Sequence, residues 1–188
     1  MSQESFLQLC TQQYGASHLP IFQSALSFSK KYLGGAKRLA GDTFLDHNVR
    51  VAEILADSKV SPEVAIAGLL HGVAKYCSEK EIEDAFGKEI LTLLKGVEEI
   101  KLVKSKNPQL EAEALRRILL TTFKDVRVIF VKLAAKLDNL RTIQVLPADD
   151  QKRIAEEVLE VYAPLANRLG LEKIKNPLED LALQVLQP

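Results

Sequence analysis

Two histidines are the residues of this sequence best suited to carry out chemistry. His47 opens the segment HNVRVAEILA, and His71 lies in the apolar segment AIAGLLHGVAKY. If both segments are helices joined by a short turn, the two imidazoles can face one cavity, where their nitrogens can bind a metal or move a proton. The alternative for His71 is a hydrogen-bonded core histidine without a ligand. His18 precedes Pro20 in a loop, and we expect it to be solvated.

Other common sources of chemistry are missing from the sequence. It contains no Gly-rich phosphate loop, no G-x-S-x-G nucleophile elbow and no CxxC pair. Its two cysteines, Cys10 and Cys77, lack the spacing of a metal or redox motif, so we predict free thiols in a reducing compartment. Function must therefore come from a less common arrangement of residues.

The composition excludes several classes of partner. The chain has 188 residues, 47% of them apolar, and its 25 Lys and Arg residues balance 25 Asp and Glu residues. Binding of duplex nucleic acid or of an anionic membrane through charge needs a surplus of basic side chains, so neither is an expected partner. No run approaches the ~20 apolar residues that span a bilayer, and the N-terminal sequence lacks the pattern of a secretory signal. We expect a cytoplasmic protein.

Helical periodicity runs through almost the whole chain. Pro20 fits the first turn of a helix, Gly34 and Gly35 fit its left-handed end, and Ser78 with Glu81 forms a capping-box pattern. Predicted helices cover residues 20–32, 47–57, 62–76, 79–86, 88–100, 110–123, 126–141, 149–169 and 177–186.

The pattern of these helices indicates the fold class. The 62–76 helix is apolar nearly all round, which is typical of a central, buried helix. The alternative for the β-branched run 126–131 is a strand, but its apolar pattern continues further than a typical strand. The sequence thus predicts a single all-α domain over residues 1–188, a bundle of about eight to ten helices.

Five segments, in this order, resemble a known family. They are KRLAGDTFLDH, HNVRVAEILA, AGLLHGVAKY, VIFVKLAAKLDNLRT and IAEEVLEVYAPLANRLGLEKIKNPLEDLAL. They are similar to the N-terminal hydrolase domain of the RelA/SpoT alarmone enzymes, which belongs to the HD phosphohydrolase superfamily. The resemblance covers roughly residues 20 to 188. It implies an all-helical, HD-type domain that, in active members, uses Mn²⁺ to remove the 3′-pyrophosphate of guanosine tetraphosphate (ppGpp) or pentaphosphate.

The resemblance also gives the family's metal ligands positions in this chain. His47 matches the first histidine ligand, and His71 matches the second. Both carboxylate ligands are missing: Gly72 replaces the Asp of the family's His-Asp pair, and Ala135 replaces the Asp of the later KLADRLHNMRT motif. The metal site of the family is therefore reduced to two imidazoles.

The pair of residues that serves the attacking water has changed as well. Lys75 and Tyr76 replace the family's Glu-Asp pair. Manganese prefers oxygen ligands, and without a metal a buried water keeps a pKa near 15.7 rather than ~7. We therefore predict a catalytically inactive domain without a cofactor, in which His47 and His71 are remnant ligands that hold no metal.

A rearranged metal site is the alternative to an inactive domain. Asp138 lies one turn after Ala135, and Asp46 lies beside His47, so either carboxylate can in principle join a Mn²⁺ site. Without that recruitment, we expect Asp138 to be a solvated residue on a helix face and Asp46 to be an N-cap.

The resemblance also implies that this chain retains residues that face the nucleotide in the family. Arg38 falls on the family's arginine that packs against guanine, and an arginine can also donate to phosphate oxygens. Leu39 and Ala40 replace the polar Lys-Ser that follows in the family's loop. The other nucleotide-binding candidates fall on the NMRT part of the later motif: Asn139, Arg141 and Thr142. The alternatives are a solvated loop residue for Arg38 and a salt-bridge partner for Arg141.

Residues 148–188 correspond to the segment that leads toward a synthetase domain in longer family members. No synthetase motif is present, so we do not expect this chain to make the alarmone from ATP and GTP or GDP by itself. We expect an excised N-terminal domain rather than a natural remnant. Three hypotheses follow: a regulatory pseudo-hydrolase that restrains or positions a linked synthetase domain, an active Mn²⁺-dependent pyrophosphohydrolase, and a non-catalytic sensor of guanine nucleotides.

Overall fold

The computed structural model describes residues 3–99 and 125–187, and this part of the chain is all-α, as predicted. An isolated antiparallel bridge between Lys37 and Thr43 closes the loop between the second and third helices. The predicted 110–123 helix lies outside the described residues. The helices are α1 (Gln3–Tyr14), α2 (Leu19–Leu33), α3 (Phe44–Asp57), α4 (Pro62–Leu70), α5 (Glu79–Glu99), α7 (Arg127–Leu140), α8 (Ala148–Glu157), α9 (Ala163–Arg168) and α10 (Glu172–Leu186).

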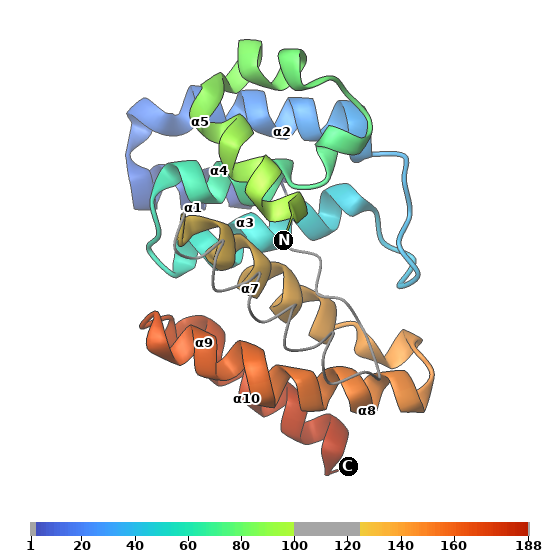
Figure 1. Ribbon diagram of the computed structural model, residues 1–188. Helices are drawn as coiled ribbons and strands as arrows, with labels where there is room; N and C mark the ends of the chain where they lie inside the picture. The colour runs from blue at the N-terminus through green and yellow to red at the C-terminus, as the bar shows by residue number, and fades with distance from the viewer. Residues whose placement is uncertain (1–2, 100–124, 188) are drawn as a thin grey trace.

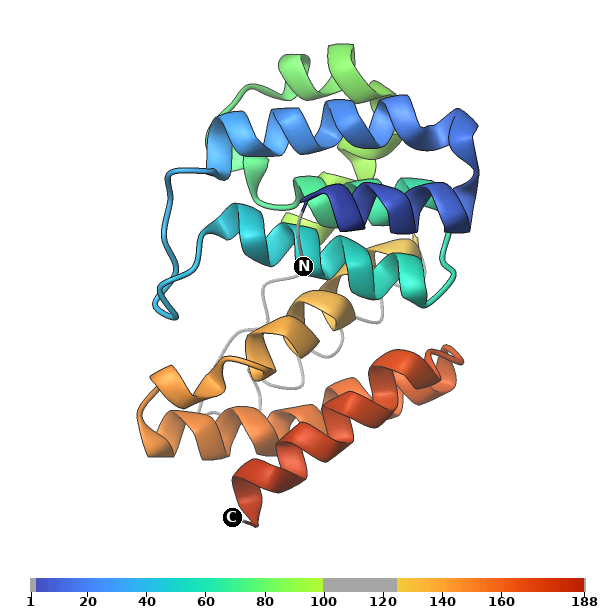
Figure 2. The ribbon, with the colours of Figure 1, turned by 180° about the vertical axis from the view of Figure 1, so that it is seen from behind.

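Helix α7 is the central element of the bundle. Figures 1 and 2 show it running obliquely between a group formed by α1 to α5 and a second group formed by α8 to α10. It packs against α3, α4 and α5 on one side and against α10 on the other. The run 126–131 is therefore helical, and the strand alternative for it is wrong.

Helix α4 is buried along its length, as its apolar composition predicted. All residues from Val64 to Leu70 are buried. It contacts α3 closely at Gly68, where an added Cβ would lie 2.5 Å from Leu55 Cδ1 and 3.4 Å from Val51 Cγ1. Glycine at this position lets the two helices that carry the histidines pack closely together.

The helix predicted over residues 62–76 ends earlier, at Leu70. His71 has extended backbone angles, and Gly72 follows with a φ of 83°, in the left-handed region that favours glycine. Asn48 stabilises this break, since its side-chain amide donates to the carbonyls of Leu69 (3.0 Å) and His71 (2.8 Å). Because α4 ends at Leu70, His71 lies just outside the helix.

Helix α3 begins at Phe44 rather than at the predicted His47. Thr43 is the N-cap, because its Oγ1 accepts a hydrogen bond from the Asp46 backbone N–H at 3.0 Å. Asp46 answers by accepting from the Thr43 backbone N–H, also at 3.0 Å. Asp46 is thus the N3 residue of a capping box. The prediction that Asp46 is the N-cap is wrong, because Thr43 occupies that position.

Two further helix starts differ from the prediction. Helix α1 was not predicted, because its mostly polar sequence offers few apolar residues; Phe6 and Cys10 are fully buried, and Phe6 packs edge-on against Phe22 at 6.1 Å. Helix α10 begins at Glu172 and contains Pro177, which was predicted to open it. In both cases tertiary packing outweighs the local signal.

Other local predictions are confirmed. Ser78 and Glu81 form the expected capping box, and Gly87, with a φ of 83°, interrupts α5. Helix α2 ends at Gly34 as expected, although Gly34 keeps right-handed helical angles. Cys10 and Cys77 are both free thiols.

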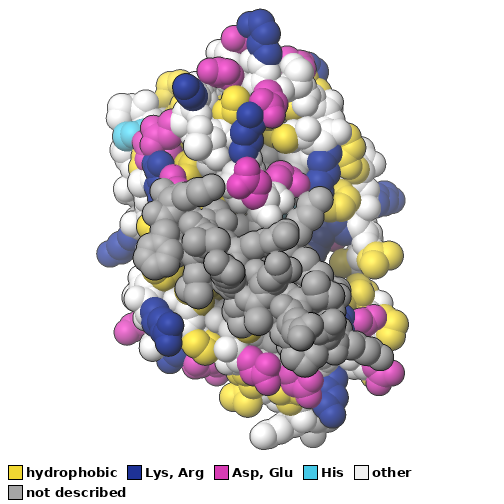
Figure 3. Space-filling model, viewed as in Figure 1, with side chains coloured by type: hydrophobic (Ala, Val, Ile, Leu, Met, Phe, Trp, Pro, Cys, Tyr) yellow, Lys and Arg dark blue, Asp and Glu magenta, His cyan; other side chains and the backbone are white. Residues whose placement is uncertain are grey.

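The distribution of charge on the surface agrees with the charge balance of the sequence, and the helices agree with the absence of a long apolar run. On the face shown in Figure 3, basic and acidic side chains of the described residues are interspersed. None of the helices within residues 3–99 and 125–187 combines the length and the apolar composition that a membrane crossing needs. The cytoplasmic location stays a prediction.

The close contact at Gly68 predicts that Gly68→Val destabilises the fold. The added side chain would overlap Leu55 Cδ1, and overpacking of a core costs about 1–3 kcal/mol. Urea unfolding should show this loss as a lower midpoint with an unchanged slope. Gly35→Ala is the control, because nothing lies within 4 Å of its added Cβ; an equal loss in both variants would contradict the packing argument.

Candidate functional site

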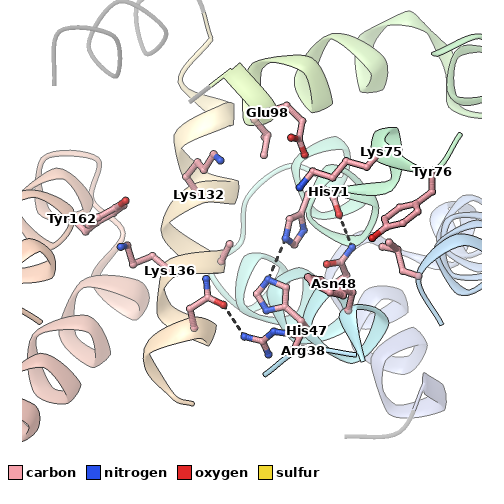
Figure 4. Close-up of a pocket in the computed structure, with 16 residues that line it drawn as sticks. Arg38, His47, Asn48, His71, Lys75, Tyr76, Glu98, Lys132, Lys136 and Tyr162 are labelled. Carbon is pink, nitrogen blue, oxygen red and sulfur yellow. Dashed lines mark hydrogen bonds between the residues drawn. The ribbon is translucent and has the colours of Figure 1, made fainter. Parts of the chain in front are cut away.

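The two predicted histidines meet at the floor of one pocket, as expected from their helices. The Nε2 atoms of His47 and His71 lie 3.2 Å apart (Figure 4). His71 Nδ1 donates to the carbonyl of Gly68 at 2.6 Å, and His47 Nδ1 donates to the carboxylate of Asp138 at 2.6 Å. Since both oxygens only accept, both Nδ1 atoms carry protons, and the contact between the two Nε2 atoms is a hydrogen bond when one of them is protonated.

His71 is held in the neutral state. Burial lowers its pKa to about 3, and the neighbouring His47 acts in the same direction. Burial removes the water that would solvate a charged imidazolium, so the neutral form of His71 is favoured. The His71 imidazole is therefore uncharged at neutral pH.

Asp138 is the buried centre of the site, so the prediction that it is solvated is wrong. It is fully buried, and Arg50 donates to its carboxylate through Nε at 2.7 Å and through Nη2 at 3.1 Å. Burial raises the pKa of Asp138, but the hydrogen bonds from His47 and Arg50 outweigh this effect and hold it at about 2. The carboxylate is thus a permanent anion that orients His47.

The network extends from Arg50 to the loop that precedes α3. Arg50 also donates to Asp42, and Arg38 donates to the same carboxylate oxygen at 2.8 Å. Arg38 then reaches α7, donating to the Asn139 side chain at 2.7 Å. The Arg38 side chain is 11% exposed, so it is an ordered member of this network rather than a solvated loop residue.

A cavity of about 530 Å³ opens above the histidine pair. Its walls come from α3, the turn after α4, the end of α5, and α7. The four positions at which the resemblance predicts that the family's metal and water-binding residues are replaced all line it: Gly72, Lys75, Tyr76 and Ala135. The cationic side chains around it, Arg38, Lys75, Lys132 and Lys136, outnumber the single acidic one among the described lining residues, Glu98.

A second cavity, of about 410 Å³, adjoins the first. The two share Arg38, Phe44, Lys136 and Asn139, so they form one continuous surface. Apolar side chains dominate the second cavity: Leu39, Ala40, Ile143, Val145, Leu146 and Ile154. Thr142 also lines it, whereas Arg141, which caps the end of α7, lines neither cavity.

Sequence reasoning missed several residues of the site. Arg50 and Asp42 join the charged network, and Lys132 and Lys136 line the pocket. A signal existed for the two lysines, since they share a helix face with Ala135 and Asn139 at spacings of three and four residues. Asp42 and Arg50 gave no such signal. Asp42 lies in the loop before α3, and its contact with Arg50 on α3 depends on how that loop folds.

The donor set of the pocket does not fit Mn²⁺. Two Nε2 atoms converge on one point, but Asp138 is engaged by His47 and Arg50, and Asp46 is engaged by Thr43. Within the described ranges, no group of three or more His, Cys, Asp or Glu side chains is placed to hold a metal ion. A hard divalent cation prefers several oxygen ligands, and the neighbouring ammonium groups repel it.

Comparison with known proteins identifies the family of the chain. A family model described as the HD domain matches residues 25–172, most of the chain. The chain belongs to the HD domain family. The resemblance to the RelA/SpoT type is confirmed by relatives that match over most of its length.

The relatives are much longer proteins. The HD domain is 40% identical over 173 residues to a guanosine-3′,5′-bis(diphosphate) 3′-pyrophosphohydrolase of Aquifex aeolicus, covering 91% of this chain and 25% of the relative. It is 38% identical over 157 residues to the bifunctional (p)ppGpp synthase/hydrolase SpoT of Escherichia coli, covering 82% and 22%. A GTP pyrophosphokinase of Myxococcus xanthus is 36% identical over 176 residues, with 90% and 23% covered. The chain thus spans about a quarter of the length of these relatives.

The burial of Asp138 predicts a large effect of Asp138→Asn on the HD domain. Removing one partner of a buried ion pair leaves the other charges without compensation, so we expect a loss of about 3 kcal/mol in the free energy of unfolding at neutral pH. Because the folded pKa of about 2 lies below the ordinary value of 3.8, the wild-type contribution is complete above about pH 4 and disappears toward about pH 2.

The measurement is denaturant unfolding of both proteins at several pH values. The difference between wild type and variant should narrow as the pH falls below 4, since the unfolded state then binds the proton more readily. Asp84→Asn is the control, because its side chain is 65% exposed and pairs with Lys80 on the surface. A constant difference across this range would show that Asp138 does not act as a charged group.

Proposed function

We propose that this HD domain binds a guanine nucleotide of the ppGpp type without hydrolysing it, and that it acts as a regulatory domain in alarmone metabolism. The observation that carries the proposal is the pocket floor, where His47 and His71 converge and where, among the described residues, no group of three or more His, Cys, Asp or Glu side chains is placed to hold a metal ion. The names of the relatives supply the class of ligand.

The absence of hydrolysis follows from the residues around the histidine pair. Hydrolysis needs a nucleophilic water, which a metal or a general base must activate. Lys75 and Tyr76 stand where the family has its Glu-Asp pair, and neither side chain is a carboxylate that could accept a proton from water. Asp138, the nearest buried carboxylate, points its charge at His47 and Arg50 instead of into the pocket.

Binding of a nucleotide follows from the two adjoining cavities. The first offers ammonium and guanidinium groups to phosphates, and the second offers an apolar surface to a base. Arg38 lies between them, and its planar guanidinium can stack on a purine. The apolar Leu39 and Ala40 replace polar side chains here, so we expect the base to be held mainly by packing.

Restoring the missing carboxylates tests the inactive site. Wild-type domain incubated with ppGpp and Mn²⁺ should release no more pyrophosphate than a sample in chelator. The double variant Gly72→Asp with Ala135→Asp adds two carboxylates beside the histidines, and the space around Gly72 is open. We expect Mn²⁺ to raise the melting temperature of this variant by about 5 °C and to leave that of the wild type unchanged.

Gly170→Asp is the matched control for the double variant. Gly170 also has a positive φ, of 70°, and open space around it, so the variant introduces the same backbone strain away from the pocket. Chromatographic detection of Mn²⁺-dependent pyrophosphate release by the wild type would contradict the proposal and favour the active enzyme.

The regulatory part of the proposal concerns a linked synthetase domain. The relatives include a bifunctional synthase/hydrolase and are about four times as long as the match. We expect the domain to restrain such a neighbour, so deletion of residues 1–188 from the complete reading frame should raise the rate of alarmone synthesis about fivefold or more. The rate of pyrophosphate transfer from ATP to GTP measures this, and equal rates with and without the domain would contradict it.

A further inference from the structure

The pocket wall nearest the histidines carries an unusual pair of lysines. Lys132 extends from α7, and Lys75 extends from the turn after α4, toward the space beside His71 (Figure 4). Both lysines line the same cavity as His47 and His71. Two positive charges therefore lie near the point on which the two Nε2 atoms converge.

Helix α7 explains why there is room for a ligand beside these lysines. Lys132, Ala135 and Lys136 occupy one face of the helix, and all three line the pocket. The methyl group of Ala135 leaves space between the two longer side chains. Lys136 is anchored at the edge, because its ammonium group lies 3.0 Å from Glu157 and 4.3 Å from the centre of the Tyr162 ring.

We propose that Lys75 and Lys132 form a metal-independent binding site for the diphosphate group of a nucleotide, in which their ammonium groups take over the charge that a divalent cation would supply. This inference rests on the proposed function and specifies how the nucleotide is held. An ammonium group is a compact charge that donates to phosphate oxygens, but it neither coordinates nor activates water. Lys75, which stands in place of a residue of the family's Glu-Asp pair, thus allows binding of the diphosphate and removes hydrolysis.

Glu98 allows a second test, in which the expected change in affinity is opposite to that of the lysine variants. It lines the same pocket from α5 and carries the one negative charge among the described lining residues. Since a diphosphate and this carboxylate repel each other, neutralising Glu98 should strengthen binding. An increase in affinity cannot come from a misfolded variant, which makes this test independent of the lysine variants.

The experiment is titration calorimetry of the full chain with inorganic pyrophosphate and, separately, with ppGpp, both in buffer with chelator. Pyrophosphate should bind without any metal, and added Mn²⁺ should not tighten binding. Lys75→Gln and Lys132→Gln should each weaken it about tenfold, and Glu98→Gln should tighten it about threefold. Lys80→Gln is the control, because Lys80 is an 81% exposed lysine on the outside of α5.

The two ligands separate the inference from the proposed function. If ppGpp binds while pyrophosphate does not, or if Lys75→Gln binds pyrophosphate as Lys80→Gln does, the diphosphate site is wrong and nucleotide binding stands. Binding that requires Mn²⁺ also overturns the inference. If neither ligand binds to the folded domain, both the inference and the nucleotide-binding function are wrong.

Discussion

The buried carboxylate of Asp138 is the interaction on which the site depends. It has no contact with solvent, and it holds His47 on one side and Arg50 on the other. A charge in this position must be compensated completely, so the two partners cannot leave without a large loss of stability. Through Asp42 and Arg38 the same network ties the loop before α3 to α7. The geometry of the pocket is therefore built on an ion-pair network.

The chemistry of the pocket follows from where negative charge is placed. Asp138 directs its charge beneath the histidines, while the side chains above them are mainly cationic. A site of this kind repels a divalent cation and attracts phosphates.

Local signals predicted most of the helices and failed where packing was decisive. Helix-breaking glycines, the capping box at Ser78 and the apolar α4 were read correctly. Helix α1 was missed because its stability comes from Phe6 and Cys10 in the core. The end of α4 was placed too late, because the sequence continues with apolar residues and the break depends on Asn48, which lies on another helix.

The sequence by itself determined the all-α class and the family resemblance, and it predicts the loss of two carboxylates at Gly72 and Ala135. These conclusions rest on residue types and on spacing along one chain. The tertiary structure alone decided the role of Asp138, which spacing suggested was solvated, since its partners lie on α3, far away in the sequence. It also decided that Lys75 and Lys132 share one wall, because contacts between distant segments depend on how helices pack and not on their local periodicity.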